Sequence, residues 1–504
     1  MKKSFTLLKL TLLFLFISLT TDTFAADKFK TNFSLTNWIF VVILLFIIII
    51  TYGILKSVVV ALKQKNDQNF NESIKTKLED VYEAKTVFLY IALIFVFLYS
   101  VYYFVQGTTW ESHVTEWLNL VVRWAHVVFG IAWIGASFYF NFLENSLNRT
   151  KDLRDELAGN LWAVHGGGFY YLEKYKVAPK EIPKDLHWFK YEAYFTWLSG
   201  FTLLVIVYYL DAKVYLIDKE VLDIPSNLAV GIGMASLLTG WIVYDLLCKS
   251  ALAKKPMLFW FILFLFLAGF AYFFLNVFSA RAAYIHVGAL IGTMMVGNVF
   301  KVIIPSQKAM VKAAKEGKIV NPLFGKNALL RSRHNNYLTL PVIFIMISNH
   351  FPSTYGNSFN WIVLIALSIC SAMVKHYLNK IEKGEKAVWI LPVAILGMIS
   401  LTFVTAPREK EVCKEDVPAT FKEVKTIIEK RCTQCHSINP TDDVQKIAPN
   451  GVMFDTPEQI KGFTDRILNR AVVTKTMPQG NKTEMTQDER DLIQCWIENG
   501  AKVK

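Results

Sequence analysis

The most specific chemical signature in the chain lies near its C-terminal end, where two residues separate Cys432 from Cys435 and His436 follows directly. Two thiols at this spacing can add to the two vinyl groups of one haem, and the adjacent imidazole can then bind the iron. A C-x-x-C redox pair is the alternative, but it needs no histidine and usually accompanies a βαβ pattern, which is not visible here. The motif therefore predicts a covalently attached haem c with His436 as an axial ligand.

The second axial ligand should be a thioether, because His436 is the only histidine in this part of the chain. Met453, Met477 and Met485 are the candidates. Met477 lies in a loop before the last predicted helix, which is the usual place for this ligand in small c-type cytochromes. We therefore predict that His436 and Met477 bind the iron, with Met485 as the second choice. Each methionine could instead pack against the haem edge.

Two further histidines lie inside long apolar runs, His126 close to Arg123 and His286 close to Arg281. Ionisable side chains in such runs are costly unless paired, so each is a candidate for function. The two imidazoles have similar predicted depths and could hold a non-covalent haem b, with either arginine near its propionates. The alternative, which the residues favour slightly, is that both imidazoles hydrogen-bond neighbouring helices.

A second polar set lies toward the predicted cytoplasmic ends of the apolar runs, whereas His126 and His286 lie toward the outer ends. Aromatic residues such as Trp162 and Trp188 accompany it, so a flat heterocycle could bind there. An amphipathic loop on a membrane surface is the alternative, and the residues alone favour it. The candidate catalytic residues in this set are Glu144, His165, His187, Glu192, Arg331, Arg333 and His334.

The elements that must position these side chains are apolar helices. Hydrophobic residues make up 53% of the 504-residue chain and the mean hydropathy is +0.34, which is too apolar for an ordinary soluble enzyme. Most lysines and arginines between the apolar runs fall in alternate loops, as the positive-inside rule requires, so the net charge of +13 needs no nucleic-acid partner. We predict ten membrane-spanning helices, near residues 36–61, 86–105, 117–141, 193–211, 226–247, 257–276, 282–304, 336–350, 359–377 and 388–405.

The chain divides into three predicted parts. Residues 1–25 have a basic start, a short apolar core and small residues at the end, which predicts a signal peptide; an uncleaved first helix is the alternative. Residues 26–406 form the predicted polytopic helical membrane bundle. Residues 407–504 have a soluble composition and form a small all-α cytochrome c domain, so the predicted fold class is all-α throughout.

Local patterns support the C-terminal assignment. Phe421, Val424 and Ile428 make an apolar stripe at helical spacing before the cysteine motif. Residues 486–489 read as a capping box that opens the last helix. Cys413 and Cys495 remain, on the predicted outer side of the membrane, where they could form a disulfide or stay as two unpaired thiols with equal expectation.

Three stretches of the chain resemble the bacterial membrane-bound urate hydroxylases. They are residues 123–139 (RWAHVVFGIAWIGASFY), residues 161–170 (LWAVHGGGFY), and residues 190–193 (KYEA) with Thr196 and Trp197. Those proteins join a urate oxidase N-terminal membrane domain to a C-terminal cytochrome c, so the resemblance covers almost the whole mature chain. It implies oxidation of urate at C5 to 5-hydroxyisourate, with electrons leaving through the fused haem instead of reducing oxygen.

The sequence therefore predicts an enzyme, a cytochrome-linked urate hydroxylase or dehydrogenase of the bacterial inner membrane with its cytochrome c domain on the periplasmic side. Urate would bind the inner polar set, where Arg331 or Arg333 offsets its charge, a His or Glu takes a proton and water supplies the hydroxyl group. The expected partners are urate, membrane lipid and a downstream cytochrome c or terminal oxidase. The alternative is a non-enzymatic membrane electron carrier or quinol-linked respiratory subunit without a urate site.

Overall fold

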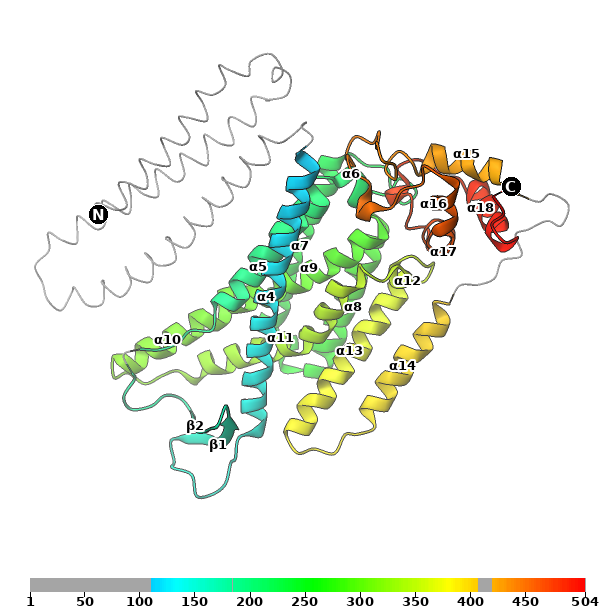
Figure 1. The fold of residues 1–504 in the computed structure, drawn as a ribbon. Helices are drawn as coiled ribbons and strands as arrows, with labels where there is room; N and C mark the ends of the chain where they lie inside the picture. Colours follow the sequence, from blue (N-terminus) through cyan, green and yellow to red (C-terminus); the bar gives the residue numbers. More distant parts are fainter. Residues whose placement is uncertain (1–109, 184, 407–418, 504) are drawn as a thin grey trace, which may run out of the picture. The chain divides into compact units, whose positions relative to one another are not determined.

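The computed structural model describes residues 110–183, 185–406 and 419–503 (Figure 1). The predicted signal peptide at 1–25, the predicted spans at 36–61 and 86–105, and Cys413 lie outside the described residues. We call residues 110–406 the helical domain and residues 419–503 the C-terminal domain.

The helical domain contains several long apolar helices, and each predicted span from residue 117 onward overlaps a helix. Its helices are α4 (Glu111–Ser146), α5 (Tyr191–Leu204), the π-helical turn η2 (Val205–Tyr209), α6 (Ala212–Tyr215), α7 (Ser226–Lys249), η3 (Ala251–Lys254), α8 (Pro256–Leu275), α9 (Ala280–Asn298), the π-helical turn η4 (Val299–Ile303), α10 (Ile304–Lys315), α11 (Pro322–Ser348), α12 (Pro352–Tyr355), α13 (Asn360–Glu382) and α14 (Ile390–Val404).

Five helical stretches in the described part of the chain are long and apolar enough to cross a membrane: His113–Ser146, Ser226–Lys249, Pro256–Leu275, Ala280–Lys315 and Asn360–Glu382. Their large apolar side chains are exposed on the outside of the bundle, as Trp124 and Ile131 of α4 show. This surface is compatible with a membrane protein, while the total of ten spans stays a prediction.

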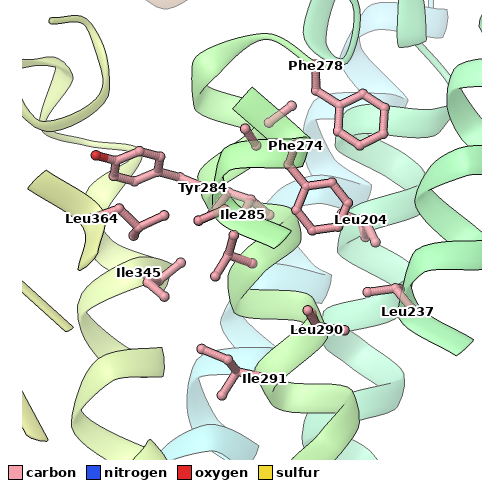
Figure 2. Close-up of a cluster of buried hydrophobic side chains, with 14 of the residues drawn as sticks. Leu204, Leu237, Phe274, Phe278, Tyr284, Ile285, Leu290, Ile291, Ile345 and Leu364 are labelled. Atoms are coloured by element: carbon pink, nitrogen blue, oxygen red, sulfur yellow. The ribbon is translucent and has the colours of Figure 1, made fainter. Parts of the chain in front are cut away.

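The core of the helical domain is built around α9, which has twelve buried residues among its nineteen. It packs against α7, α8 and α11. Figure 2 shows Leu290 of α9 beside Leu237 of α7, with Ile345 of α11 in the same cluster. A Cβ on Gly240 of α7 would lie 2.0 Å from the Leu290 side chain, so a larger residue at this position would force Leu290 to shift.

Residues 157–175 depart from the predicted all-α fold. They form an antiparallel hairpin of β1 (Leu157–His165) and β2 (Gly168–Tyr175). Gly166 and Gly167 have φ angles of 58° and 79°, which a two-residue hairpin turn of this kind requires at both positions. The glycine run therefore makes a tight turn, and it was the local signal for a hairpin.

Helix α11 begins fourteen residues before the predicted span at 336–350. Pro322 occupies its first turn, and the Asn321 side chain accepts a hydrogen bond from the backbone N–H of Leu323 over 2.9 Å. The polar residues from Arg331 to Asn336 are consequently inside the helix, not at its entrance. Hydropathy placed the start too late because this stretch has few apolar residues.

The C-terminal domain has its own apolar core, to which α15 and α18 both contribute. Val424 and Ile428 of α15 and Ile493 and Trp496 of α18 are buried together. Both helices start with a capping box, and the one predicted at Thr486 is confirmed. The helices are α15 (Phe421–Arg431), η5 (Pro449–Gly451), α16 (Pro457–Gly462), α17 (Thr464–Ile467), the π-helical turn η6 (Leu468–Val473), η7 (Gln479–Asn481) and α18 (Gln487–Glu498).

Candidate functional site

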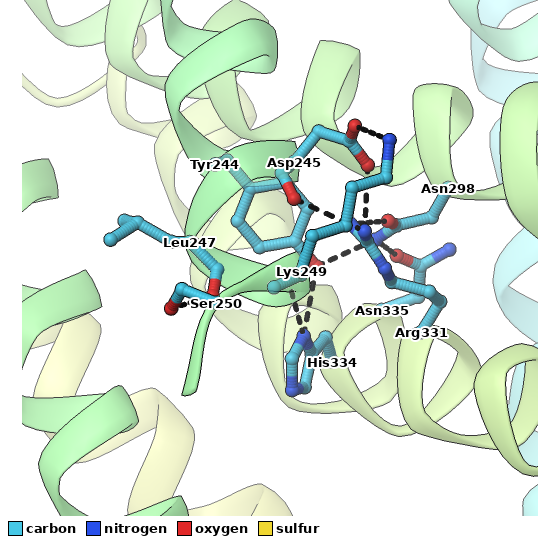
Figure 3. Close-up of polar contacts among 10 residues, drawn as sticks. Tyr244, Asp245, Leu247, Lys249, Ser250, Asn298, Arg331, His334 and Asn335 are labelled. Atoms are coloured by element: carbon cyan, nitrogen blue, oxygen red, sulfur yellow. Dashed lines mark hydrogen bonds and ion pairs between the residues drawn. The ribbon is translucent and has the colours of Figure 1, made fainter. Parts of the chain in front are cut away.

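A buried polar network joins α7, α9 and α11, and it contains two of the predicted catalytic residues (Figure 3). The guanidinium of Arg331 lies 2.6 Å from the carboxylate of Asp245 and donates to Asn298 Oδ1 over 3.0 Å. Asn298 donates to Asn335 Oδ1 over 2.8 Å. Because every one of these contacts crosses between helices, the network fixes how α7, α9 and α11 pack.

His334 belongs to the same network through Tyr244. The phenol oxygen of Tyr244 lies 2.9 Å from His334 Nδ1 and accepts a hydrogen bond from Asn298 over 2.9 Å. The phenol hydrogen can then point to Nδ1, which makes Nε2 the protonated nitrogen of His334. The ring of His334 stacks on Phe259, with 4.7 Å between the centroids. This histidine is therefore held rigidly in one orientation.

An open cavity of about 440 Å³ lies beside this network. Asp245 lines it and also pairs with Lys249 over 2.5 Å. The cavity is of ordinary size for a small ligand. Its lining residues are Trp241, Asp245, Lys249, Lys301, Val302, Pro305, Ser306 and Phe324.

The other predicted catalytic residues are not brought into this network. Glu144 forms ion pairs with Lys174 and Arg149 at the hairpin. His165, His187 and Arg333 are exposed, and the ring of His187 lies against Phe189 at 4.5 Å between centroids.

Glu192 differs from the rest of the predicted set. It lies in the first turn of α5, and its Oε2 atom is buried without a hydrogen-bond partner among the described residues. Burying a carboxylate oxygen without a hydrogen-bond partner costs free energy unless a proton or a ligand satisfies the oxygen. Glu192 is therefore a candidate to receive a proton or to accept a hydrogen bond from a substrate N–H. Its role as a catalytic residue stays a prediction.

His126 and His286 are both hydrogen-bonded to neighbouring groups. His126 Nδ1 lies 3.0 Å from the carbonyl oxygen of Thr196. His286 is fully buried, with Nδ1 2.8 Å from the Ala282 carbonyl and Nε2 3.1 Å from the Tyr209 hydroxyl. Both imidazoles thus bond to neighbouring groups, and in each ring Nδ1 lies near a backbone carbonyl. The haem b between them stays a prediction.

The cysteine motif lies directly after α15, and its geometry fits a covalently bound haem. Cys432 and Cys435 are free thiols. His436 Nδ1 lies 2.9 Å from the carbonyl oxygen of Val452, so Nδ1 carries the hydrogen and Nε2 is free to bind iron. Burial lowers the pKa of His436, which favours the neutral imidazole that a metal requires. The two thiols would attach the haem, and His436 would hold the iron from one side.

The two methionine candidates differ in their surroundings. Met477 is half-buried, and its carbonyl accepts a hydrogen bond from Arg490 over 2.8 Å. Met485 is 1% exposed and belongs to the apolar core around Trp496. Met477 as the second ligand stays a prediction.

Cys495 is disulfide-bonded, so it is not a free thiol.

The chain belongs to the Urate oxidase N-terminal family, whose pattern matches residues 112–406 and therefore more than half of the sequence. The match ends at the last residue of the helical domain. No curated protein and no solved structure shows a significant match to the chain. Family membership supports an oxidoreductase that acts on urate.

Proposed function

We propose that the protein oxidises urate to 5-hydroxyisourate and passes the electrons to its own haem c and on to a downstream cytochrome c or terminal oxidase. The observation that carries this proposal is the presence in one chain of a urate oxidase N-terminal region and a C-x-x-C-H segment whose histidine has Nδ1 near a backbone carbonyl. Bound haem supplies one-electron acceptance, since its iron cycles between two oxidation states.

The reaction balances with water as the oxygen source. Urate and one water give 5-hydroxyisourate, two protons and two electrons. A base must take a proton from the attacking water or from urate, and Glu192 is our candidate because its buried oxygen has no hydrogen-bond partner in the described part of the chain. Arg331 is paired with Asp245 and Asn298, so we assign it to holding the helices and not to binding the substrate.

We further propose that the protein lies in the bacterial inner membrane with the C-terminal domain on the periplasmic side. The five membrane-length helices support this location. A reporter fused after Lys315 should be active only if it works in the cytoplasm, and one fused after Lys504 only if it works outside. Activity of both reporters on the same side would contradict this arrangement.

The decisive experiment is anaerobic titration of the purified, oxidised full-length protein with urate. Haem reduction should follow urate addition, and product formed in isotopically labelled water should carry the label. If a quinol reduces the haem but urate does not, the protein is a quinol-linked electron carrier instead. Label from oxygen gas and not from water would contradict the proposed reaction.

A further inference from the structure

Helix α13 carries an interior lysine that the sequence interpretation did not single out. Lys375 is 0% exposed, and its Nζ atom has no hydrogen-bond partner among the described residues. The ammonium lies 3.4 Å from the ring centroid of Phe138 on α4. A cation–π contact offsets only part of the free energy needed to bury a charge. An anion at this position would neutralise the ammonium of Lys375.

A second unpartnered polar side chain lies on the neighbouring helix. Asn336 of α11 is 3% exposed, and neither its Oδ1 nor its Nδ2 has a partner among the described residues. The next residue, Tyr337, bonds through its hydroxyl to His376 Nδ1 over 2.7 Å. Residues 336–337 of α11 therefore lie level with residues 375–376 of α13.

The carboxylate on α13 itself acts on Lys375 only at a distance and forms no ion pair with it in the described part of the chain. Glu382 is seven residues further along, about 10 Å down the helix axis at 1.5 Å per residue. Its Oε2 atom accepts hydrogen bonds from Asn141 over 2.9 Å and from Asn145 over 2.7 Å. These amides hold the carboxylate toward α4, and no ion pair with Lys375 forms in the described part of the chain.

We propose that the interior between α4, α11 and α13 binds the urate anion, with Lys375 as its counter-ion and Asn336 as a hydrogen-bonding partner. This inference rests on the proposed function and locates its substrate. Urate is a planar anion with both N–H donors and carbonyl acceptors, and the Asn336 amide offers one group of each kind. The ring of Phe138, which the Lys375 ammonium contacts, adds an apolar surface beside this counter-ion.

The cavity beside Asp245 provides the competing location and also the control. Lys301 lines that cavity, is exposed, and has its ammonium 5.1 Å from the ring of Phe300. It is thus a second lysine next to a phenylalanine, but at the surface. Replacing Lys301 and Lys375 by the same residue compares the two locations directly.

The test measures urate binding and turnover in the full-length, haem-loaded protein. Binding is measured by equilibrium dialysis with the dithionite-reduced protein, which cannot accept electrons, and turnover by urate-dependent haem reduction. Lys375→Met should raise both the Kd and the KM for urate by about tenfold or more, because the anion loses its buried counter-ion. Lys375→Arg should restore part of the affinity, and Lys301→Met should change neither constant.

Asn336→Leu keeps the branching and the number of heavy atoms of the side chain, and it provides a second test if Lys375→Met does not fold. It should weaken urate binding while the haem spectrum and the elution volume in detergent stay unchanged. Wild-type affinity in both Lys375→Met and Asn336→Leu would overturn the location, as would loss of binding in Lys301→Met alone. If the unmodified protein neither binds urate nor reduces its haem with it, the proposed function fails, and this inference fails with it.

Discussion

Arg331 and Asp245 form an ion pair inside the helical domain, with 2.6 Å between Nη2 and Oδ1 and side-chain exposures of 5% and 16%. Two charges taken out of water are stable together only when their remaining hydrogen bonds are satisfied, and Asn298 supplies one of these to Arg331. Removal of Asp245 would leave the buried charge of Arg331 without this ion pair, and removal of Arg331 would leave Asp245 with only the exposed Lys249 as its ion-pair partner.

Arg331→Met should therefore destabilise the helical domain by about 3–5 kcal/mol, the range for breaking a buried pair on one side. The measurement is thermal or denaturant unfolding of the purified protein in detergent. Lys249→Met is the matched control, because Lys249 pairs with the same Asp245 but its side chain is 67% exposed, and the expected change is below about 1 kcal/mol. Equal effects of the two variants would argue against a structural role for Arg331.

The second axial ligand can be distinguished by comparing two methionines. Met477→Ala should abolish the methionine–iron charge-transfer band while the haem stays covalently attached through Cys432 and Cys435. Met485→Ala should keep the band and lower the stability of the C-terminal domain by about 2–5 kcal/mol, because Met485 is 1% exposed in the core. Loss of the band only in Met485→Ala would reverse the assignment.

Features encoded by local sequence could be predicted well. The capping box at Thr486 depends on residues three positions apart, and apolar runs as long as α7 or α8 have few alternatives to a helix. The start of α11 was missed because a helix with a polar face toward buried partners has a weak hydropathy signal. The hairpin was not predicted, because its strands of nine and eight residues lie between long apolar helices and show no strict alternation of apolar and polar residues.

The candidate site was only partly predictable, because the role of each residue depends on which polar atoms are hydrogen-bonded in the folded protein. The sequence singled out Arg331 and Glu192 alike as polar residues near apolar runs. The fold gives Arg331 two partners, whereas an oxygen of Glu192 has none among the described residues. Lys375 was missed because one lysine near the end of an apolar helix ordinarily reaches the membrane surface, and only the fold shows it buried against Phe138.

An acid-sensitive contact is expected in the C-terminal domain. Asp442 is buried, which raises its pKa, but hydrogen bonds from Lys482, Gln445 and Val444 outweigh burial and hold the pKa below the usual 3.8. A carboxyl group whose pKa is lowered by folding contributes stability above its unfolded pKa, and this contribution is lost as the pH falls through the lower, folded value.

Asp442→Asn should therefore lower the stability of this domain at pH 7 by about 1–3 kcal/mol and flatten its loss of stability below about pH 4. Unfolding is followed by haem absorbance in the full-length protein. Asp443→Asn is the control, because Asp443 also pairs with Lys482 but its side chain is 66% exposed. An unchanged acid profile in Asp442→Asn would contradict the assignment.

The last prediction concerns the number of haem groups between urate and the downstream acceptor. Both nitrogens of His286 are hydrogen-bonded, and a Cβ on Gly233 would lie only 2.9 Å from Nε2, so the ring is already in close contact with α7. We therefore expect a pyridine haemochrome of the full-length protein to show c-type haem alone. One urate should then reduce the haem of two protein molecules, because each molecule accepts one electron at a time. A b-type signal that disappears in His126→Ala or His286→Ala, together with reduction of one protein molecule per urate, would instead establish haem b as an intermediate carrier.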